Sequence, residues 1–395
     1  MKRSFTAAAL AAAFGLAAGA AHAQDIAIGY NSDMSATGSA EFGISSKYGI
    51  ELAVDDLNRQ GGLLGHKVVA IYRDDFGQPP KAIQNANELI DNEHVVLLLG
   101  AANSGNVLAW MHIPEQKKIP VISPIGTATA ITQRYMSAPA NFMFRDSMVD
   151  RDQISLILAY AIRKSPAHKI AFIVDTTGYG QQALKDLREV AKLYGFKAVA
   201  EEQFGPKDTD MTSQLSKIKA AGAEVLITYA LSDANGQVMR SLEKISYFPA
   251  VVAPWADINT PFKTIAGKDL ASKAIFTASV TADSSPAAAA LNERLLRAHP
   301  DMPTFVSAAQ AYDAVMIFAA AVKQAGTTDG ATVQQVLENL DTAEGVVKTY
   351  HHPFSHTNHE ALNNSDYHFA QWVNDRIIVY KDAITESIRP EDLRK

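Results

Sequence analysis

The chain has 395 residues, of which 47% are apolar, with 36 basic and 42 acidic side chains and no cysteine. The lack of cysteine excludes disulfides, thiol catalysis and thiolate metal sites, and the lack of a basic cluster argues against nucleic acid as a partner. Because the length exceeds what one ordinary hydrophobic core holds, we expect two domains.

Residues 1–23 have the pattern of a secretory signal peptide. Lys2 and Arg3 precede an apolar run rich in alanine, and Ala21-His22-Ala23 forms a small-x-small ending. The apolar run is short for a membrane span. We therefore expect cleavage after Ala23 and a soluble protein outside the cytoplasm.

Short β-branched runs alternate with helical stretches from residue 25 to about residue 145. The runs that predict strands occupy residues 26–30, 68–72, 95–99 and 119–123. The run at 95–99 is apolar on both faces, which is typical of a parallel strand covered by helices on both sides. This first half therefore predicts a parallel sheet.

The same alternation starts again after residue 145. The expected strands of this second series occupy residues 169–174, 197–203, 224–229 and 250–253, and 367–372 with 376–380 predict a final β-hairpin turning at Asn374-Asp375. Two successive series predict an α/β fold of two doubly wound parallel-sheet lobes. Ligands of such sheets bind beyond the carboxyl ends of the strands, so we expect a cleft between the lobes.

Small polar segments follow three of the predicted strands, at residues 100–106, 123–129 and 175–180. Each segment precedes a helix, whose first backbone N–H groups lack partners. Taken singly, Ser104 and Thr127 are best explained as helix caps. Taken together, the segments favour a cleft that binds a carboxylate or another anion.

Several motifs then carry a family resemblance over nearly the whole chain after residue 23. They are GIELAVDDLNRQGG at 49–62, YRDD at 72–75, IPVISP at 119–124, FRD at 144–146 followed by DQ at 152–153, and DTTGYG at 175–180. In order and spacing the sequence resembles the type I periplasmic solute-binding proteins of ABC importers, in the branched-chain amino acid (Leu/Ile/Val) branch.

The resemblance implies a three-stranded hinge between the lobes. The chain would cross near residues 145, 276 and 348. Lobe one would hold residues 24–145 plus 277–348, and lobe two would hold residues 146–276 plus 349–395.

The resemblance also implies ligand-binding positions. Ser104 and Thr127 match the residues that hold the ligand carboxylate, with the Ile125 backbone beside them. Phe42 and Tyr179 match aromatic residues of the first and second lobe.

Two positions depart from the family pattern. The acid that pairs with the ligand ammonium falls at Trp255, and a second tyrosine falls near Leu231. A buried ammonium without an anionic partner costs several kcal/mol, whereas tryptophan offers apolar area and a stacking face. We therefore expect a carboxylate ligand without an α-ammonium: an aromatic acid, a phenylalkanoate, or a 2-oxo or hydroxy acid. Asp257 or Asp233 could instead supply the missing charge, and Trp255 could be a core residue.

The expected function is ligand capture by hinge closure, as the periplasmic component of an ABC importer that docks on a membrane permease. We expect a monomer without cofactor or metal; the histidines at residues 351–360 match no zinc spacing. Alternatives are an amino acid, an amide or urea as ligand, and a sensing subunit of a receptor. An enzyme is disfavoured because the sequence lacks a G-x-S-x-G elbow, an H-E-x-x-H helix and a P-loop.

Overall fold

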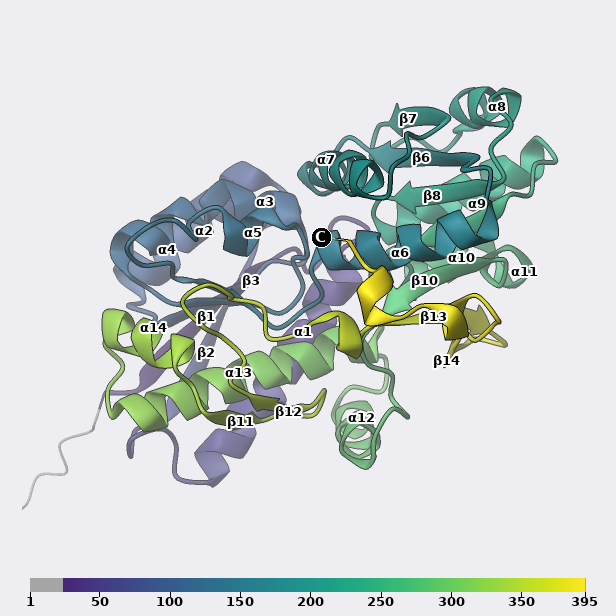
Figure 1. Ribbon diagram of the computed structural model, residues 1–395. Coiled ribbons are helices and arrows are strands. Elements are labelled where there is room, and N and C mark those ends of the chain that lie inside the picture. Colours follow the sequence, from purple (N-terminus) through teal and green to yellow (C-terminus); the bar gives the residue numbers. More distant parts are fainter. Residues whose placement is uncertain (1–23, 395) are drawn as a thin grey trace, which may run out of the picture.

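The computed structural model of the protein describes residues 24–394, arranged as two α/β lobes side by side (Figure 1). The expected signal peptide lies outside the described residues. Each lobe has a central sheet covered by helices, as the alternation of apolar runs predicts, and the expected α/β fold class is confirmed.

The first lobe is built on a parallel five-stranded sheet in the order β2-β1-β3-β4-β5. Its strands are β1 (Ile26–Ser32), β2 (Val68–Asp74), β3 (Leu97–Gly100), β4 (Val121–Ser123) and β5 (Met143–Arg145). Its helices are α1 (Ala40–Arg59), α2 (Pro79–Asn87), a π-helical turn (Glu88–Asn92), α3 (Ser104–Trp110), α4 (His112–Lys117), α5 (Ala130–Gln133), α12 (Pro286–Ala298), α13 (Phe305–Ala325) and α14 (Gly330–Glu338). A two-stranded sheet of β11 (Thr342–Glu344) and β12 (Thr349–His351) packs on α13.

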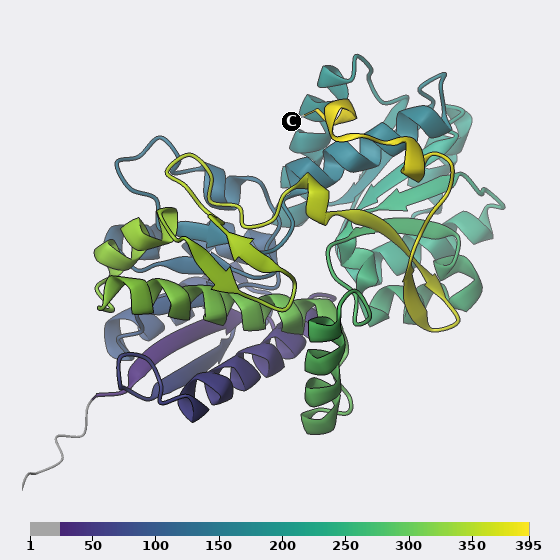
Figure 2. The same ribbon diagram turned by 60° about the horizontal axis from the view of Figure 1, so that its bottom comes forward.

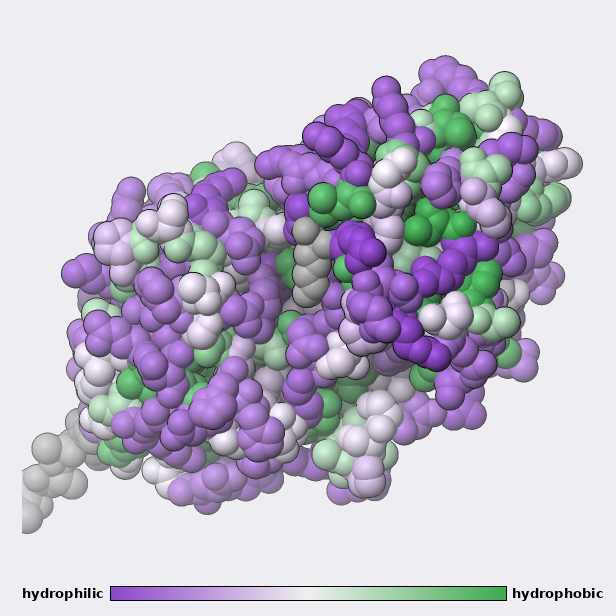
Figure 3. Space-filling view, in the orientation of Figure 1, coloured by the Kyte–Doolittle hydropathy of each residue, from purple (hydrophilic) through white to green (hydrophobic). Residues whose placement is uncertain are grey.

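Helices α1 and α13 pack against each other in the first lobe. One face of α1 is apolar and buried, with Ile50, Ala53 and Leu57 fully enclosed. A Cβ on Gly49 would lie 2.0 Å from the Ala308 carbonyl oxygen, so glycine permits the close approach of the two helices. By length and composition α13 could cross a membrane, but 83% of its apolar stretch is buried inside the protein. Hydrophilic residues predominate instead on the face of the molecule in Figure 3.

The second lobe is built on a seven-stranded sheet in the order β14-β13-β10-β9-β8-β6-β7. Its strands are β6 (Ile170–Asp175), β7 (Ala200–Phe204), β8 (Val225–Tyr229), β9 (Ala250–Ala253), β10 (Ala274–Ala278), β13 (His368–Val373) and β14 (Arg376–Val379). Its helices are α6 (Asp150–Lys164), α7 (Gly178–Leu193), α8 (Thr212–Ala220), α9 (Ser232–Lys244), α10 (Thr260–Ala266) and α11 (Lys268–Ala271). Short 3₁₀ turns lie at Trp255–Ile258, Asn364–Asp366, Thr385–Ser387 and Pro390–Asp392.

The C-terminal hairpin joins the second lobe as expected. β13 runs antiparallel to both β10 and β14, whereas β10, β9, β8, β6 and β7 are parallel. Asn374 and Asp375 both have positive φ, 48° and 64°, which is the geometry of a tight two-residue turn. Figure 2 shows this hairpin on the second lobe and the β11–β12 hairpin on the first.

Strand pairing shows where the chain passes between the lobes. β10 stays in the second sheet to Ala278, and β12 pairs with β11 of the first lobe. The N–H of Ala361 donates to the Arg145 carbonyl, and the Arg145 N–H donates to the His359 carbonyl. The second sheet thus includes β10 as far as Ala278, and the chain still pairs with β5 of the first lobe at residues 359–361. The lobe boundaries deduced from the sequence stay a prediction.

Candidate ligand-binding site

An enclosed cavity lies between the two lobes, at the carboxyl ends of strands from both sheets. Its free space is only about 20 Å³. The first lobe contributes the start of α1 and the segments that follow β3 and β4. The second lobe contributes the start of α7, the segment that follows β8 and the 3₁₀ turn that follows β9. The lining residues are Phe42, Ala102, Asn103, Ser104, Ile125, Thr127, Tyr179, Leu231, Ser232, Trp255 and Ala256.

This cavity brings together most of the residues expected at the site. They are Phe42, Ser104, Ile125, Thr127, Tyr179, Leu231 and Trp255. Their positions follow from the topology, because parallel strands deliver the loops at their carboxyl ends to one edge of each sheet. Whether these side chains contact a ligand stays a prediction.

The two acids held open as ammonium partners do not line the cavity. Asp257 is buried, and its Oδ1 accepts a hydrogen bond of 2.7 Å from Asn235 Nδ2. Asp233 lies against Gly38 of the first lobe, where a Cβ would come within 1.9 Å of its Oδ1. The structure therefore does not bring Asp257 to the cavity, because the 3₁₀ turn directs Trp255 toward it and Asp257 toward α9.

Ser104 does not cap its helix. Asn103 is the N-cap of α3, and its side-chain oxygen accepts from the Gly105 N–H at 2.8 Å. The Ser104 Oγ instead accepts from the backbone N–H groups of Thr127 and Ala128, at 3.1 and 3.2 Å. These bonds use its lone pairs and leave its hydroxyl proton available to an acceptor in the cavity.

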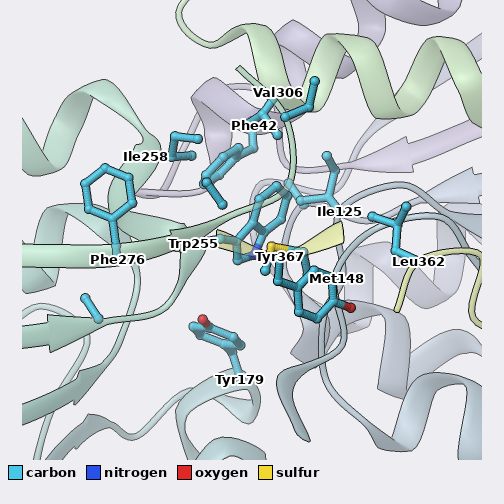
Figure 4. Packing of buried hydrophobic residues seen from close by; sticks show 14 of the residues in the cluster. Phe42, Ile125, Met148, Tyr179, Trp255, Ile258, Phe276, Val306, Leu362 and Tyr367 are labelled. Atoms are coloured by element: carbon cyan, nitrogen blue, oxygen red, sulfur yellow. The ribbon is translucent and has the colours of Figure 1, made fainter. Parts of the chain in front are cut away.

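The lobes are closed on each other around the cavity (Figure 4). The Phe42 ring stacks on the Trp255 indole, with 5.2 Å between ring centroids and 28° between the planes. Ser232 Oγ donates to the Gly38 carbonyl at 2.9 Å, also across the cleft. Contacts between opposite lobes thus bury the residues that line the cavity.

Tyr179 presents a buried hydroxyl from the second lobe. Burial raises the pKa of Tyr179 well above its usual value, and the nearby Thr127 hydroxyl offsets part of this effect. Within residues 24–394 its hydroxyl has no hydrogen-bond partner of normal geometry. It is therefore free to donate to an acceptor in the cavity.

A buried carboxyl group stands behind Trp255. Asp150, the first residue of α6, accepts from Tyr229 Oη at 3.0 Å and from Gln153 Nε2 at 3.3 Å. The Gln153 Oε1 in turn accepts from the backbone N–H of Trp255 at 3.1 Å and from Thr277 Oγ1 at 2.7 Å. Gln153 thus ties the position of Trp255 to the Asp150 carboxyl.

Asp150 makes stability depend on pH. Burial, with repulsion from Asp186, raises the pKa of Asp150 from 3.8 to about 7. The folded state therefore keeps a proton that the unfolded state releases between these values, and this contribution to stability is lost as the pH rises through 7. Between pH 5 and pH 8, the free energy of unfolding of the parent should fall by about 2–3 kcal/mol because of this group. The isosteric variant Asp150→Asn should not show this fall.

Urea unfolding at several pH values measures this difference. The asparagine keeps a side-chain oxygen that accepts from Tyr229 and Gln153. The difference between the pH profiles of parent and variant therefore reports the proton on Asp150. Parallel pH profiles for the parent and the variant would contradict the assignment to Asp150.

A buried ion pair fixes the loop that carries Thr127. Arg145, at the end of β5, is fully buried and binds both carboxylate oxygens of Glu360, at 2.6 and 2.7 Å. Its Nη1 also donates to the carbonyls of Gly126 and Ala128, at 3.1 and 3.0 Å. The FRD motif at residues 144–146 does not predict this role, because the partner of Arg145 lies 215 residues away.

The histidine-rich segment contributes packing at the hinge. His359 is fully buried, stacks on Phe144 with 4.0 Å between ring centroids, and has its Nδ1 2.9 Å from the Met143 carbonyl. Across residues 24–394, no group of three or more histidine or acidic side chains is arranged to hold a metal ion.

Comparisons with known proteins agree with this architecture. A family model described as periplasmic binding protein matches residues 25–376. The chain is 27% identical over 343 residues to Leu/Ile/Val-binding protein homolog 3 of Brucella melitensis biotype 1, covering 86% of this chain and 90% of that one. It is 26% identical to the Leu/Ile/Val-binding protein BraC3 of Rhizobium johnstonii, covering 79% and 82%.

Solved structures show the same fold. A type 1 periplasmic binding protein from Bordetella pertussis Tohama I superposes with a TM-score of 0.81 at 23% identity, covering 90% of this chain and all of that one. The branched-chain amino acid binding protein LivJ from Streptococcus pneumoniae, in complex with isoleucine, has a TM-score of 0.76 at 22% identity, covering 91% and 100%. The chain belongs to the type I periplasmic binding proteins, in their branched-chain amino acid family.

Proposed function

We propose that this protein is the solute-binding component of an ABC importer and captures a small carboxylate that carries no α-ammonium. One observation carries the proposal. The cavity lining combines the hydroxyls of Ser104, Thr127 and Tyr179 with aromatic walls, and within residues 24–394 no acidic side chain is part of that lining.

The hydroxyls suit a carboxylate. A carboxylate accepts hydrogen bonds only, and Ser104 and Tyr179 each have a proton to donate. An ammonium group in the same place would find no acidic side chain in the cavity lining, and burying an ammonium without an anionic partner costs several kcal/mol. Phe42 and Trp255 offer apolar faces to the rest of the ligand.

Capture proceeds by hinge closure. The closed cavity, at about 20 Å³, holds about one water molecule, so a ligand binds to the open form and the lobes then close on it. Ser104 and Thr127 receive the ligand on lobe one, and Tyr179 and Trp255 of lobe two complete its enclosure. Binding shifts the equilibrium toward the closed form, which a membrane permease would recognise on a monomer in the periplasm.

The main alternative ligand is an amino acid. Relatives are named for leucine, isoleucine and valine, and one structural neighbour holds isoleucine. An amino acid would need an acidic partner for its ammonium, and neither Asp257 nor Asp233 lines the cavity. A short amide or urea is a further alternative ligand, which a thermal-shift screen tests. A sensing role at a receptor is an alternative function, which identification of the docking partner tests.

Thr127→Ala tests the carboxylate assignment. We expect it to lower the affinity for carboxylate ligands by roughly 1–3 kcal/mol, because one hydrogen bond to a charged group is lost. Isothermal titration calorimetry measures the effect. The control is Thr129→Ala, whose hydroxyl accepts from the Arg151 N–H and does not line the cavity. An unchanged affinity in Thr127→Ala, or an equal loss in both variants, would refute the assignment.

A further inference from the structure

A second and larger pocket lies between the lobes, with a volume of about 370 Å³. Lobe two contributes the end of the 3₁₀ turn after β9 and the start of β14, and lobe one contributes α12 and the start of α13. Its apolar lining residues are Ile258, Val280, Ala282, Phe305, Val306 and Ile377. Its volume falls in the range typical of small-molecule sites.

The Phe42–Trp255 stack, which lines the small cavity, lies beside residues that line this pocket. Ile258 belongs to the same 3₁₀ turn as Trp255. On the other lobe, the Thr304 N–H donates to the Oγ of Ser45, one turn along α1 from Phe42. Figure 4 shows Ile258 and Val306 beside Phe42 and Trp255, with Tyr179 on the opposite side.

The two spaces have complementary chemistry. The small cavity offers hydroxyl donors and, in this closed form, has room for about one water molecule. The larger pocket offers apolar side chains together with polar and charged ones, among them Asp283, Asn292 and Arg376. Burying an apolar tail there gains roughly 25 cal/mol per Å² removed from water.

Building on the carboxylate function proposed above, we propose that the two pockets are the head and tail compartments of one site for an elongated aryl- or alkylcarboxylate. The carboxylate binds at Ser104 and Thr127, and the tail passes the aromatic stack into the larger pocket. The passage forms as the lobes part, because Phe42 and Trp255 belong to opposite lobes. In the closed complex, the rings of Phe42 and Trp255 then stack on the ligand tail rather than on each other.

Calorimetric titration with acids of increasing length tests this proposal. The probes are propanoate, hexanoate, 3-phenylpropanoate and 5-phenylpentanoate. Ala282→Trp fills the larger pocket from a half-buried position on the segment after β10. We expect the parent to bind the longer acids more tightly, and Ala282→Trp to weaken them at least tenfold while changing propanoate less than twofold.

Two further variants test whether the effect comes from filling the larger pocket. Ile377→Trp fills the same pocket from the second lobe and should reproduce the pattern if Ala282→Trp misfolds. Ala290→Trp is the control, since Ala290 is exposed on α12 and lines neither pocket, and it should bind every acid as the parent does.

The outcomes separate the two proposals. If the parent binds carboxylates with no dependence on length, or if the filling variants weaken short and long acids equally, the tail compartment is refuted and the carboxylate function stands. If the parent binds no carboxylate of any length, the carboxylate function fails, and the tail compartment with it.

Discussion

Arg145→Met is expected to lower the free energy of unfolding by about 3–5 kcal/mol, the cost of leaving one partner of a buried ion pair uncompensated. Arg145 is 0% exposed and holds Glu360 through two short bonds. The substitution also removes the donors to the carbonyls of Gly126 and Ala128, which flank Thr127. We therefore expect lower ligand affinity together with lower stability.

Chemical denaturation measures the stability, and Arg163→Met is the control. Arg163 pairs with Asp392 at 2.7 Å, but both side chains are about one-third exposed. Such a pair contributes at most about 1 kcal/mol. If the two arginine variants lost similar stability, the account of Arg145 as the residue that fixes the loop carrying Thr127 would be wrong.

Trp255→Glu is expected to lower the affinity for anionic ligands by at least about 100-fold. It places a carboxylate in the lining of a closed cavity, where like charges at close range cost several kcal/mol. It also removes the stack on Phe42. The same negative charge should pair with an ammonium, so leucine and valine should gain affinity.

Trp255→Gln separates the charge from the loss of the ring. It is nearly the same shape as Trp255→Glu, so the difference between the two variants in calorimetry reports the charge alone. We expect the glutamine variant to bind acids more tightly than the glutamate variant and amino acids less tightly. Identical ligand profiles for the parent and both variants would mean that Trp255 does not contact the ligand.

Much of the fold could be predicted because strand and helix patterns are local. The run at 95–99 is apolar on both faces and forms part of a central parallel strand, β3. Asn374 and Asp375 specify a tight turn without reference to distant residues. Residues 79–92 between β2 and β3 are helical, as α2 followed by a π-helical turn.

The features that sequence analysis missed depend on tertiary contacts or on single-residue geometry. The ion pair of Arg145 and Glu360 joins residues 215 positions apart, and the sequence around neither residue predicts it. From the sequence alone Ser104 is best explained as a helix cap, but in the structure Asn103 is the N-cap of α3. Asp257 lies two residues after Trp255, and only the 3₁₀ turn determines which of them reaches the cavity.

The central claim is that the ligand is a carboxylate without an ammonium group. A thermal-shift screen of the purified protein tests it, because a ligand that binds only the folded state raises the melting temperature. The panel holds leucine, valine, aromatic acids, phenylalkanoates, 2-oxo acids, short amides and urea. We predict stabilisation by ammonium-free acids and none by leucine or valine. Stabilisation by leucine or valine, with no effect of the ammonium-free acids, would contradict the account.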